Sequence, residues 1–200
     1  MSERRIVIVA NGGANTASLQ FALQRLGAAS EVSADPAAIQ AATHVILPGV
    51  GAAADAMSRL RHSGLDALLP ALRLPVLGIC LGMQLLFDAS QEGDVACLGI
   101  IPGRACRFPA HAARPVPHMG WNTLNLRRPC ALLEGLTEGS HAYFVHSYAL
   151  EVGDATVASS SYGEPFSACV QRDNFYGTQF HPERSAAVGA RLLQNFLALN

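Results

Sequence analysis

The chain has 200 residues, of which 50% are hydrophobic and 14% are charged, and 14 basic residues stand against 15 acidic ones for a formal net charge of −1. This composition excludes a disordered chain and argues against nucleic acid or an anionic membrane as the main partner, because either would select a basic surplus. The length predicts a single domain, residues 1–200, with a sizeable core.

The first half of the chain alternates strand and helix patterns. Short apolar or β-branched runs predict buried strands, at residues 5–9, 30–33, 43–47 and 75–79. Apolar residues at helical spacing, with capping and stop signals, predict helices at residues 18–26, from Pro36, at 52–61 and at 81–89.

The second half is richer in strands. Turn signals separate predicted strands at residues 143–150, 155–160, 166–171 and 174–180, and a last helix is expected at 186–199. We therefore expect an α/β sandwich with helices on both faces of a mostly parallel sheet, which gains antiparallel strands late in the chain.

The cysteines and apolar runs indicate a cytoplasmic protein. Five cysteines lie at 80, 97, 106, 130 and 169 without a Cys-x-x-Cys pair, which argues against a zinc site and predicts small buried side chains in a reducing compartment for all but Cys80. The longest uncharged apolar run, residues 74–87, is too short to span a bilayer, and the N-terminal run breaks too early for a signal peptide.

The sharpest local pattern is Gly-Ile-Cys-Leu-Gly around Cys80, between a predicted strand and a predicted helix. A nucleophile at such an elbow sits on a strained turn, with flanking glycines where side chains would collide. The start of the following helix favours the thiolate of Cys80. The alternative is a buried cysteine between two packing glycines.

A nucleophilic cysteine needs a base and a group that orients it. His181 ends a predicted strand, and Glu183, two residues on, can reach the same side and hold the imidazole tautomer. The alternative is a surface His-Pro-Glu turn. We interpret His44, His62 and His111 as solvent or loop residues.

Two backbone regions are candidates for an oxyanion hole. One is the N–H of Leu81, directly after the nucleophile, and the other is the Pro-Gly-Val-Gly loop with Gly49, Val50 and Gly51. The second could equally be an ordinary strand-to-helix turn.

These segments and others, taken in order, resemble class I glutamine amidotransferases. PGVG, GICLGMQ and QFHPE carry the family resemblance, and PHMGWN and YFVHSY are similar to the glutaminase subunits of imidazole glycerol phosphate synthase. The resemblance runs from about residue 5 to the C-terminus and implies the flavodoxin-like sandwich of class I glutaminases.

The resemblance implies a role for each matching residue. Cys80 would be the nucleophile, His181 the base and acid, and Glu183 the orienting carboxylate. Glutamine would be bound by Gly49, Val50, Gly51, Leu81, Gln84, His146, Ser147 and Tyr148. A partner would be contacted by Asn15, His118, Met119, Trp121, Asn122 and Arg184.

One segment departs from the family pattern. After the first strand, Ala10 and Asn11 replace an Asp-Tyr pair and Gly13 replaces Met, while Asn15 and Ser18 match. The departure bears on partner contacts rather than on the triad. Arg184 replaces the usual Lys and keeps its charge.

The resemblance implies a cofactor-free, metal-free glutaminase. Its ammonia would pass through a channel to a (β/α)8-barrel cyclase, in a heterodimer that makes imidazole glycerol phosphate and AICAR in histidine biosynthesis. The alternatives are a paralogue that supplies ammonia to another acceptor such as a surface-polysaccharide sugar, and a non-catalytic regulatory relative. A thiol hydrolase of the dienelactone type would share the Cys80 elbow, but not QFHPE or YFVHSY.

Overall fold

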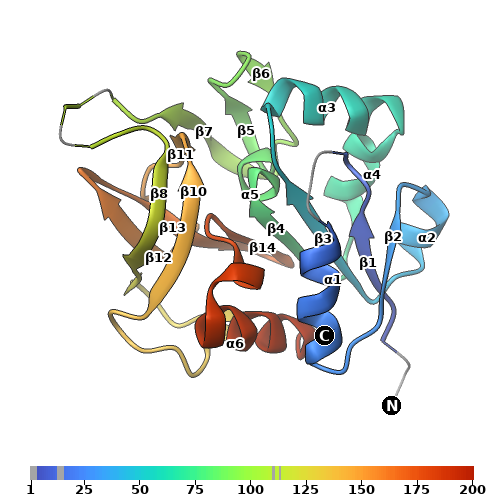
Figure 1. The fold of residues 1–200 in the computed structure, drawn as a ribbon. Helices are drawn as coiled ribbons and strands as arrows, with labels where there is room; N and C mark the ends of the chain where they lie inside the picture. Colours follow the sequence, from blue (N-terminus) through green and yellow to red (C-terminus); the bar gives the residue numbers. More distant parts are fainter. Residues whose placement is uncertain (1–3, 13–15, 110, 113) are drawn as a thin grey trace.

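The computed structural model describes residues 4–12, 16–109, 111–112 and 114–200. Asn15 and Gly13, named above, lie outside these residues. The largest sheet has eight strands in the order β2-β1-β3-β4-β14-β13-β12-β9 (Figure 1). Its strands are β1 (Ile6–Val9), β2 (Ser30–Ser33), β3 (His44–Gly49), β4 (Val76–Cys80), β9 (Asn125–Leu126), β12 (Thr156–Tyr162), β13 (Glu164–Arg172) and β14 (Phe175–Thr178).

The pairing confirms the predicted mixed sheet. The strands β2, β1, β3, β4 and β14 pair in parallel, whereas β13, β12 and β9 extend the sheet beyond β14 by antiparallel pairing. The carboxyl ends of the parallel strands therefore converge at one edge, and there β4 ends at Cys80 beside β14.

Alternate residues of the parallel strands face two helical layers. Ile6 and Ile8 belong to the core formed with α1 (Thr16–Arg25) and α6 (Ala186–Leu197). Val7 and Val9 belong to the core formed with the other helices (Figure 1), which are α2 (Pro36–Gln40), α3 (Ala53–His62), α4 (Leu65–Ala71) and α5 (Leu81–Leu85). Strands buried on both faces explain the low share of charged residues.

Two small sheets flank the site edge. In one, β8 (His118–Thr123) pairs antiparallel with β10 (His141–His146). The other has the order β11-β7-β5-β6 and contains β11 (Tyr148–Ala149), β7 (Ile101–Arg107), β5 (Phe87–Ser90) and β6 (Val95–Ala96). Two 3-10 turns complete the fold, η1 (Ala131–Leu133) and η2 (Pro182–Arg184). The sequence patterns do not predict β7, β8 or α4.

The predicted helix at 81–89 is wrong in its second half. Helix α5 ends at Leu85, because the amides of Leu98 and Gly99 donate to the carbonyls of Leu85 and Phe87 at 3.0 and 2.9 Å. The helix could continue only by losing these bonds, so the chain leaves Leu85 as strand β5. Similarly, the predicted strand at 143–150 is divided into β10 and β11.

The interpretation of His44 as a solvent or loop residue is also wrong. Its side chain is buried, its Nε2 lies 3.1 Å from the carbonyl oxygen of Leu199, and its ring packs edge-on against Phe196. His62 and His111 are exposed, as expected.

All five cysteines are free thiols. Cys169 is buried as predicted, whereas Cys97, Cys106 and Cys130 are only half-buried. Within the described residues, no helix has the length and apolar character needed to cross a membrane.

Candidate active site

The backbone at Cys80 has the geometry of a nucleophile elbow. Cys80 has φ 55° and ψ −112°, a conformation that L-residues rarely adopt. The two flanking glycines permit it. A Cβ at Gly78 would lie 2.7 Å from the carbonyl oxygen of Gly82, and a Cβ at Gly82 would lie 1.8 Å from that of Leu47. Glycines at these positions therefore let α5 pack directly on β3 and β4, with Cys80 at the turn.

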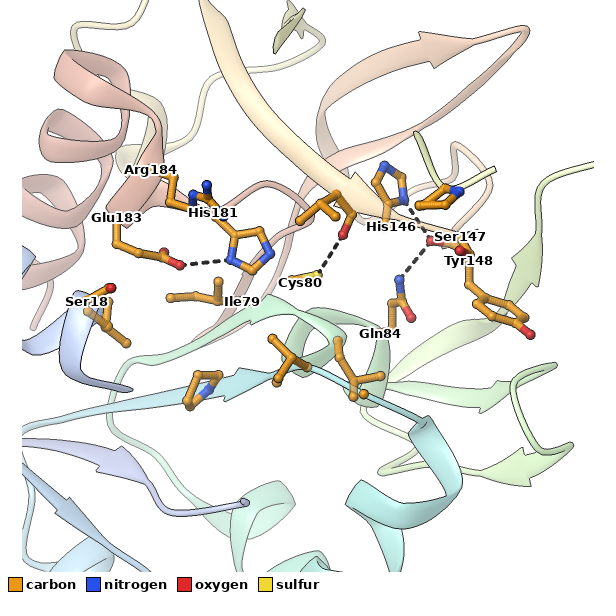
Figure 2. A pocket seen from close by; sticks show the side chains of 18 of the residues that line it. Ser18, Ile79, Cys80, Gln84, His146, Ser147, Tyr148, His181, Glu183 and Arg184 are labelled. Carbon is orange, nitrogen blue, oxygen red and sulfur yellow. Dashed lines mark hydrogen bonds and ion pairs between the residues drawn. The ribbon is translucent and has the colours of Figure 1, made fainter. Parts of the chain in front are cut away.

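His181 and Glu183 form the pair that the sequence predicts. His181 Nδ1 lies 2.9 Å from Glu183 Oε1, and both side chains are about nine-tenths buried (Figure 2). A carboxylate can only accept, so Nδ1 carries the proton and Nε2 is left to face the sulfur of Cys80. Among the described groups, Nε2 has no hydrogen bond of standard geometry, but it lies close enough to Cys80 for a side-chain interaction with the sulfur.

The surroundings of His181 favour its charged form. Burial lowers the pKa of the imidazole, but the interactions with Cys80 and Glu183 outweigh burial and raise the pKa to about 10. These interactions favour the imidazolium form of His181, which lies between a carboxylate and the sulfur. A cation in this position stabilises a thiolate at Cys80.

A cavity of about 740 Å³ opens above Cys80. It brings together residues that are far apart in the sequence, from the loop after β3, the elbow, the segment after β10 and the His-Pro-Glu turn. All eight residues assigned above to glutamine binding line this cavity, together with Cys80, His181 and Glu183. A Cβ at Gly49, the last residue of β3, would lie 2.8 Å from the amide nitrogen of Gly82, so the end of β3 lies directly against the elbow.

Two polar residues at this site were missed from the sequence. Glu92 lines the cavity, where its Oε2 accepts from the Ala53 amide at 3.0 Å, and burial raises the pKa of its carboxyl. Gln179 is fully buried, and its Nε2 lies 3.7 Å from Cys80 Sγ. Glu92 gives no local signal, whereas Gln179 belongs to the QFHPE motif without an assigned role.

Gln84 and His146 line the cavity with their polar atoms already engaged. Gln84 Nε2 donates to the carbonyl of Tyr148 and to Oε1 of Gln179, both at 2.9 Å, which leaves only its oxygen for a ligand. His146 Nδ1 lies 2.8 Å from the same Tyr148 carbonyl. The segment at 146–148 can therefore offer a ligand backbone groups rather than the His146 ring.

Four of the residues assigned to a partner share strand β8, whose two faces differ. Met119 and Trp121 are 63% and 54% exposed. On the opposite face, His118 is buried and Asn122 is half-buried. A direct side-chain contact of His118 with a partner is therefore blocked in this structure.

Arg184 lies near the exposed face of β8. Its guanidinium stacks at 4.7 Å on the Tyr143 ring, which meets Trp121 edge-on, and Arg184 also lines the cavity. This apolar and cationic surface therefore borders the cavity that contains Cys80, His181 and Glu183.

Comparisons with known proteins identify the family and the fold. The family model described as Glutamine amidotransferase class-I matches residues 7–199. Among solved structures, a glutamine amidotransferase is 20% identical with a TM-score of 0.74, covering 96% of this chain and 97% of that chain. A putative GMP synthase subunit from Thermoplasma acidophilum is 19% identical with a TM-score of 0.75, covering 99% and 94%. These two structures show the fold.

Closer relatives narrow the class. Imidazole glycerol phosphate synthase subunit HisH from Xanthomonas oryzae pv. oryzae is 52% identical over 195 residues, covering 98% of each chain. The protein of the same name from Xylella fastidiosa strain Temecula1 is 50% identical with the same coverage. The chain therefore belongs to the class I glutamine amidotransferases and, within them, to the HisH subunits of imidazole glycerol phosphate synthase.

Proposed function

We propose that Cys80, His181 and Glu183 form a catalytic triad that hydrolyses L-glutamine to glutamate and ammonia. The observation that carries this proposal is a cysteine on a strained elbow, faced by the free Nε2 of a histidine whose Nδ1 is held by a carboxylate at 2.9 Å. This is the arrangement of nucleophile, base and orienting group that acyl transfer requires.

The reaction proceeds in two halves. The Cys80 thiolate attacks the side-chain amide carbon of glutamine, and the carbonyl electrons move to the oxygen. The oxyanion then collapses, the C–N bond breaks, and the His181 imidazolium gives its Nε2 proton to the departing ammonia. Neutral His181 next takes a proton from water, which attacks the γ-glutamyl thioester. The C–S bond breaks, glutamate leaves, and the thiolate–imidazolium pair is restored.

The cavity offers complementary groups for each end of glutamine. Glu92 is the acidic lining residue that remains once Glu183 is bound to His181, so it would take the α-ammonium, together with the Gln84 oxygen. The backbone at 146–148 would bind the α-carboxylate. The oxyanion would be met by the N–H of Leu81 and by a second N–H from the loop after β3, where Gly51 has φ +88°. This chemistry needs no cofactor.

The ammonia would pass to a partner protein rather than to solvent. We propose a (β/α)8-barrel cyclase as that partner, in a heterodimer whose contacts include Met119, Trp121 and Arg184. The exposed apolar pair on β8 supports this surface, since large exposed apolar side chains that cluster mark interaction sites. Five free thiols fit a reducing, cytoplasmic location.

The test separates the two halves of the complex. Cys80→Ala should abolish glutamine-dependent formation of imidazole glycerol phosphate with the co-purified cyclase. Ammonia-dependent synthesis should persist, because only the glutaminase half needs the thiolate. Glutaminase activity near the wild-type level in Cys80→Ala would refute the site assignment. Normal glutamine hydrolysis without transfer to the cyclase would instead point to a different acceptor.

A further inference from the structure

Gln179 is a buried polar residue with no part in the mechanism above. Its carboxamide nitrogen lies 3.7 Å from Cys80 Sγ, within the range of a hydrogen bond to sulfur. We propose that Gln179 is a further catalytic residue, whose amide N–H donates a hydrogen bond to the Cys80 thiolate and stabilises it. This inference rests on the proposed role of Cys80 as the nucleophile.

The two groups that hydrogen-bond to the sulfur act in opposite directions. The thiol can donate to the carbonyl of Val145 at 3.8 Å, and this contact favours the protonated form. Once the thiol has lost its proton, the Val145 carbonyl cannot hydrogen-bond to the sulfur, because a carbonyl oxygen and a thiolate are both acceptors. Gln179 can only donate at its nitrogen, and a donor strengthens its bond when the acceptor becomes an anion. Cys80 is only 7% exposed, so water can contribute few hydrogen bonds that stabilise the thiolate.

The orientation of the Gln179 amide is fixed by its hydrogen bond with Gln84. Its Oε1 accepts from Gln84 Nε2 at 2.9 Å, which turns the nitrogen of Gln179 toward the sulfur. Gln84 is itself oriented, because its nitrogen also donates to the Tyr148 carbonyl at 2.9 Å, and a carbonyl cannot donate. Exchanging nitrogen and oxygen in Gln84 would place two acceptors face to face, and exchanging them in Gln179 would place two donors face to face.

A second series of hydrogen bonds ends on the same carbonyl. In Figure 2, lines from His146 and Gln84 meet at the Tyr148 oxygen. His146 must carry its proton on Nδ1 to donate there. Its Nε2 can then accept from Nδ1 of His118 at 3.0 Å, and Nε2 of His118 can accept from Asn122 Nδ2 at 3.2 Å. Every donor in this series points toward Tyr148.

Burial keeps both histidines in this arrangement. It lowers the pKa of His118 to about 4 and that of His146 to about 3, so both rings are neutral over the physiological range. A neutral ring has one donor and one acceptor nitrogen, which is what the series requires. His118 and His146 are therefore positioning residues. They hold the carbonyl that orients Gln84, and Gln84 in turn orients Gln179.

The test measures the thiolate directly and needs no glutamine. The second-order rate of Cys80 alkylation by neutral iodoacetamide is recorded against pH, with the labelled peptide identified by mass spectrometry because the chain has four other thiols. Gln179→Met removes the donor without adding a charge. We expect its profile to move to higher pH by about one unit, so that alkylation near neutral pH is about tenfold slower.

Two further variants guard against a folding artefact. Gln84→Met leaves Gln179 in place but frees its orientation, and should give a smaller shift in the same direction. Gln171→Glu serves as the control, because Gln171 lies on β13, where its Nε2 contacts the Tyr176 hydroxyl at 3.5 Å, away from the cavity. Its profile should match that of the wild type.

The outcomes are distinct. An unchanged alkylation profile in folded Gln179→Met, as judged by circular dichroism, would overturn the proposal even if turnover fell. If Gln179→Met does not fold, an unchanged profile in Gln84→Met would do the same. Failure of the proposed function would instead appear as glutaminase activity that survives Cys80→Ala.

Discussion

Gly189 in α6 touches no reacting atom, yet we predict that Gly189→Ala disables the enzyme. A Cβ at this position would lie 1.8, 2.6 and 2.8 Å from the carbonyl oxygen, carbonyl carbon and Cα of Pro182. Pro182 is the residue between His181 and Glu183. An ordinary contact needs about 3.4 Å, so the turn or the helix must move by roughly 1.6 Å.

The His-Pro-Glu turn cannot move without breaking the hydrogen bonds of Ser185. Ser185 Oγ donates to the His181 carbonyl at 2.7 Å and accepts from the Tyr143 amide at 2.9 Å. A shift of this size therefore also disturbs His181, and a misplacement of about 1 Å can cost about 100-fold in rate. We expect kcat/KM for glutamine to fall about 100-fold, and the free energy of unfolding to fall by about 1–3 kcal/mol from overpacking.

The sign of the stability change makes the test sharp. At an uncrowded interior helix position, replacing Gly by Ala raises the free energy of unfolding by about 1 kcal/mol, so a stabilised variant would contradict the reasoning. The assays are coupled glutamate detection and urea denaturation. Gly153→Ala is the matched control, because nothing lies within 4 Å of its Cβ position. Activity of Gly189→Ala within twofold of wild type would refute the argument.

Three other predictions follow from the site. His181→Ala should remove nearly all glutaminase activity, whereas Glu183→Gln should keep a weak, measurable rate; the reverse order would exchange their roles. Burial lowers the pKa of His118 to about 4, so the free energy of unfolding should fall as the pH falls from 6.5 toward 4. In urea titrations, His118→Gln should reduce the slope of the free energy of unfolding against pH by about 1.4 kcal/mol per pH unit. Glutamine hydrolysis should be slow in the lone chain and faster by orders of magnitude in the acceptor-bound complex, because we expect the loop after β3 to turn its N–H toward the oxyanion only in the complex. Equal rates would exclude this gating by the loop.

Local patterns predicted the parts of the site that are local. Gly-Ile-Cys-Leu-Gly can be recognised as an elbow within five residues. A side chain at Gly78 would clash inside the turn, with Gly82, whereas one at Gly82 would clash with Leu47 on the neighbouring strand β3. His181 and Glu183 are two residues apart, so their pairing also follows from backbone geometry. The alternating strands and helices of the first half are equally local, since each is read from its own periodicity.

What the sequence did not predict depends on distant partners. Gln179 meets Cys80 from 99 positions away, and His118 meets His146 across 28 positions, so no spacing signals either contact. Strand β5 continues an apolar pattern that suits a helix, and it is set by hydrogen bonds from residues 98–101. Tertiary pairing thus overrides local propensity where backbone groups find partners elsewhere.

The position of β14 also has a consequence for biosynthesis. This strand follows the other seven strands of the large sheet in the sequence, but it lies in the middle of that sheet, parallel to β4 and antiparallel to β13. A nascent chain that ends before Phe175 exposes two unpaired strand edges and lacks both His181 and Glu183. Such a chain is prone to aggregate, but under the proposed mechanism it would be unable to hydrolyse glutamine. Completion of the sheet and synthesis of His181 and Glu183 therefore come together, after the other seven strands have been made.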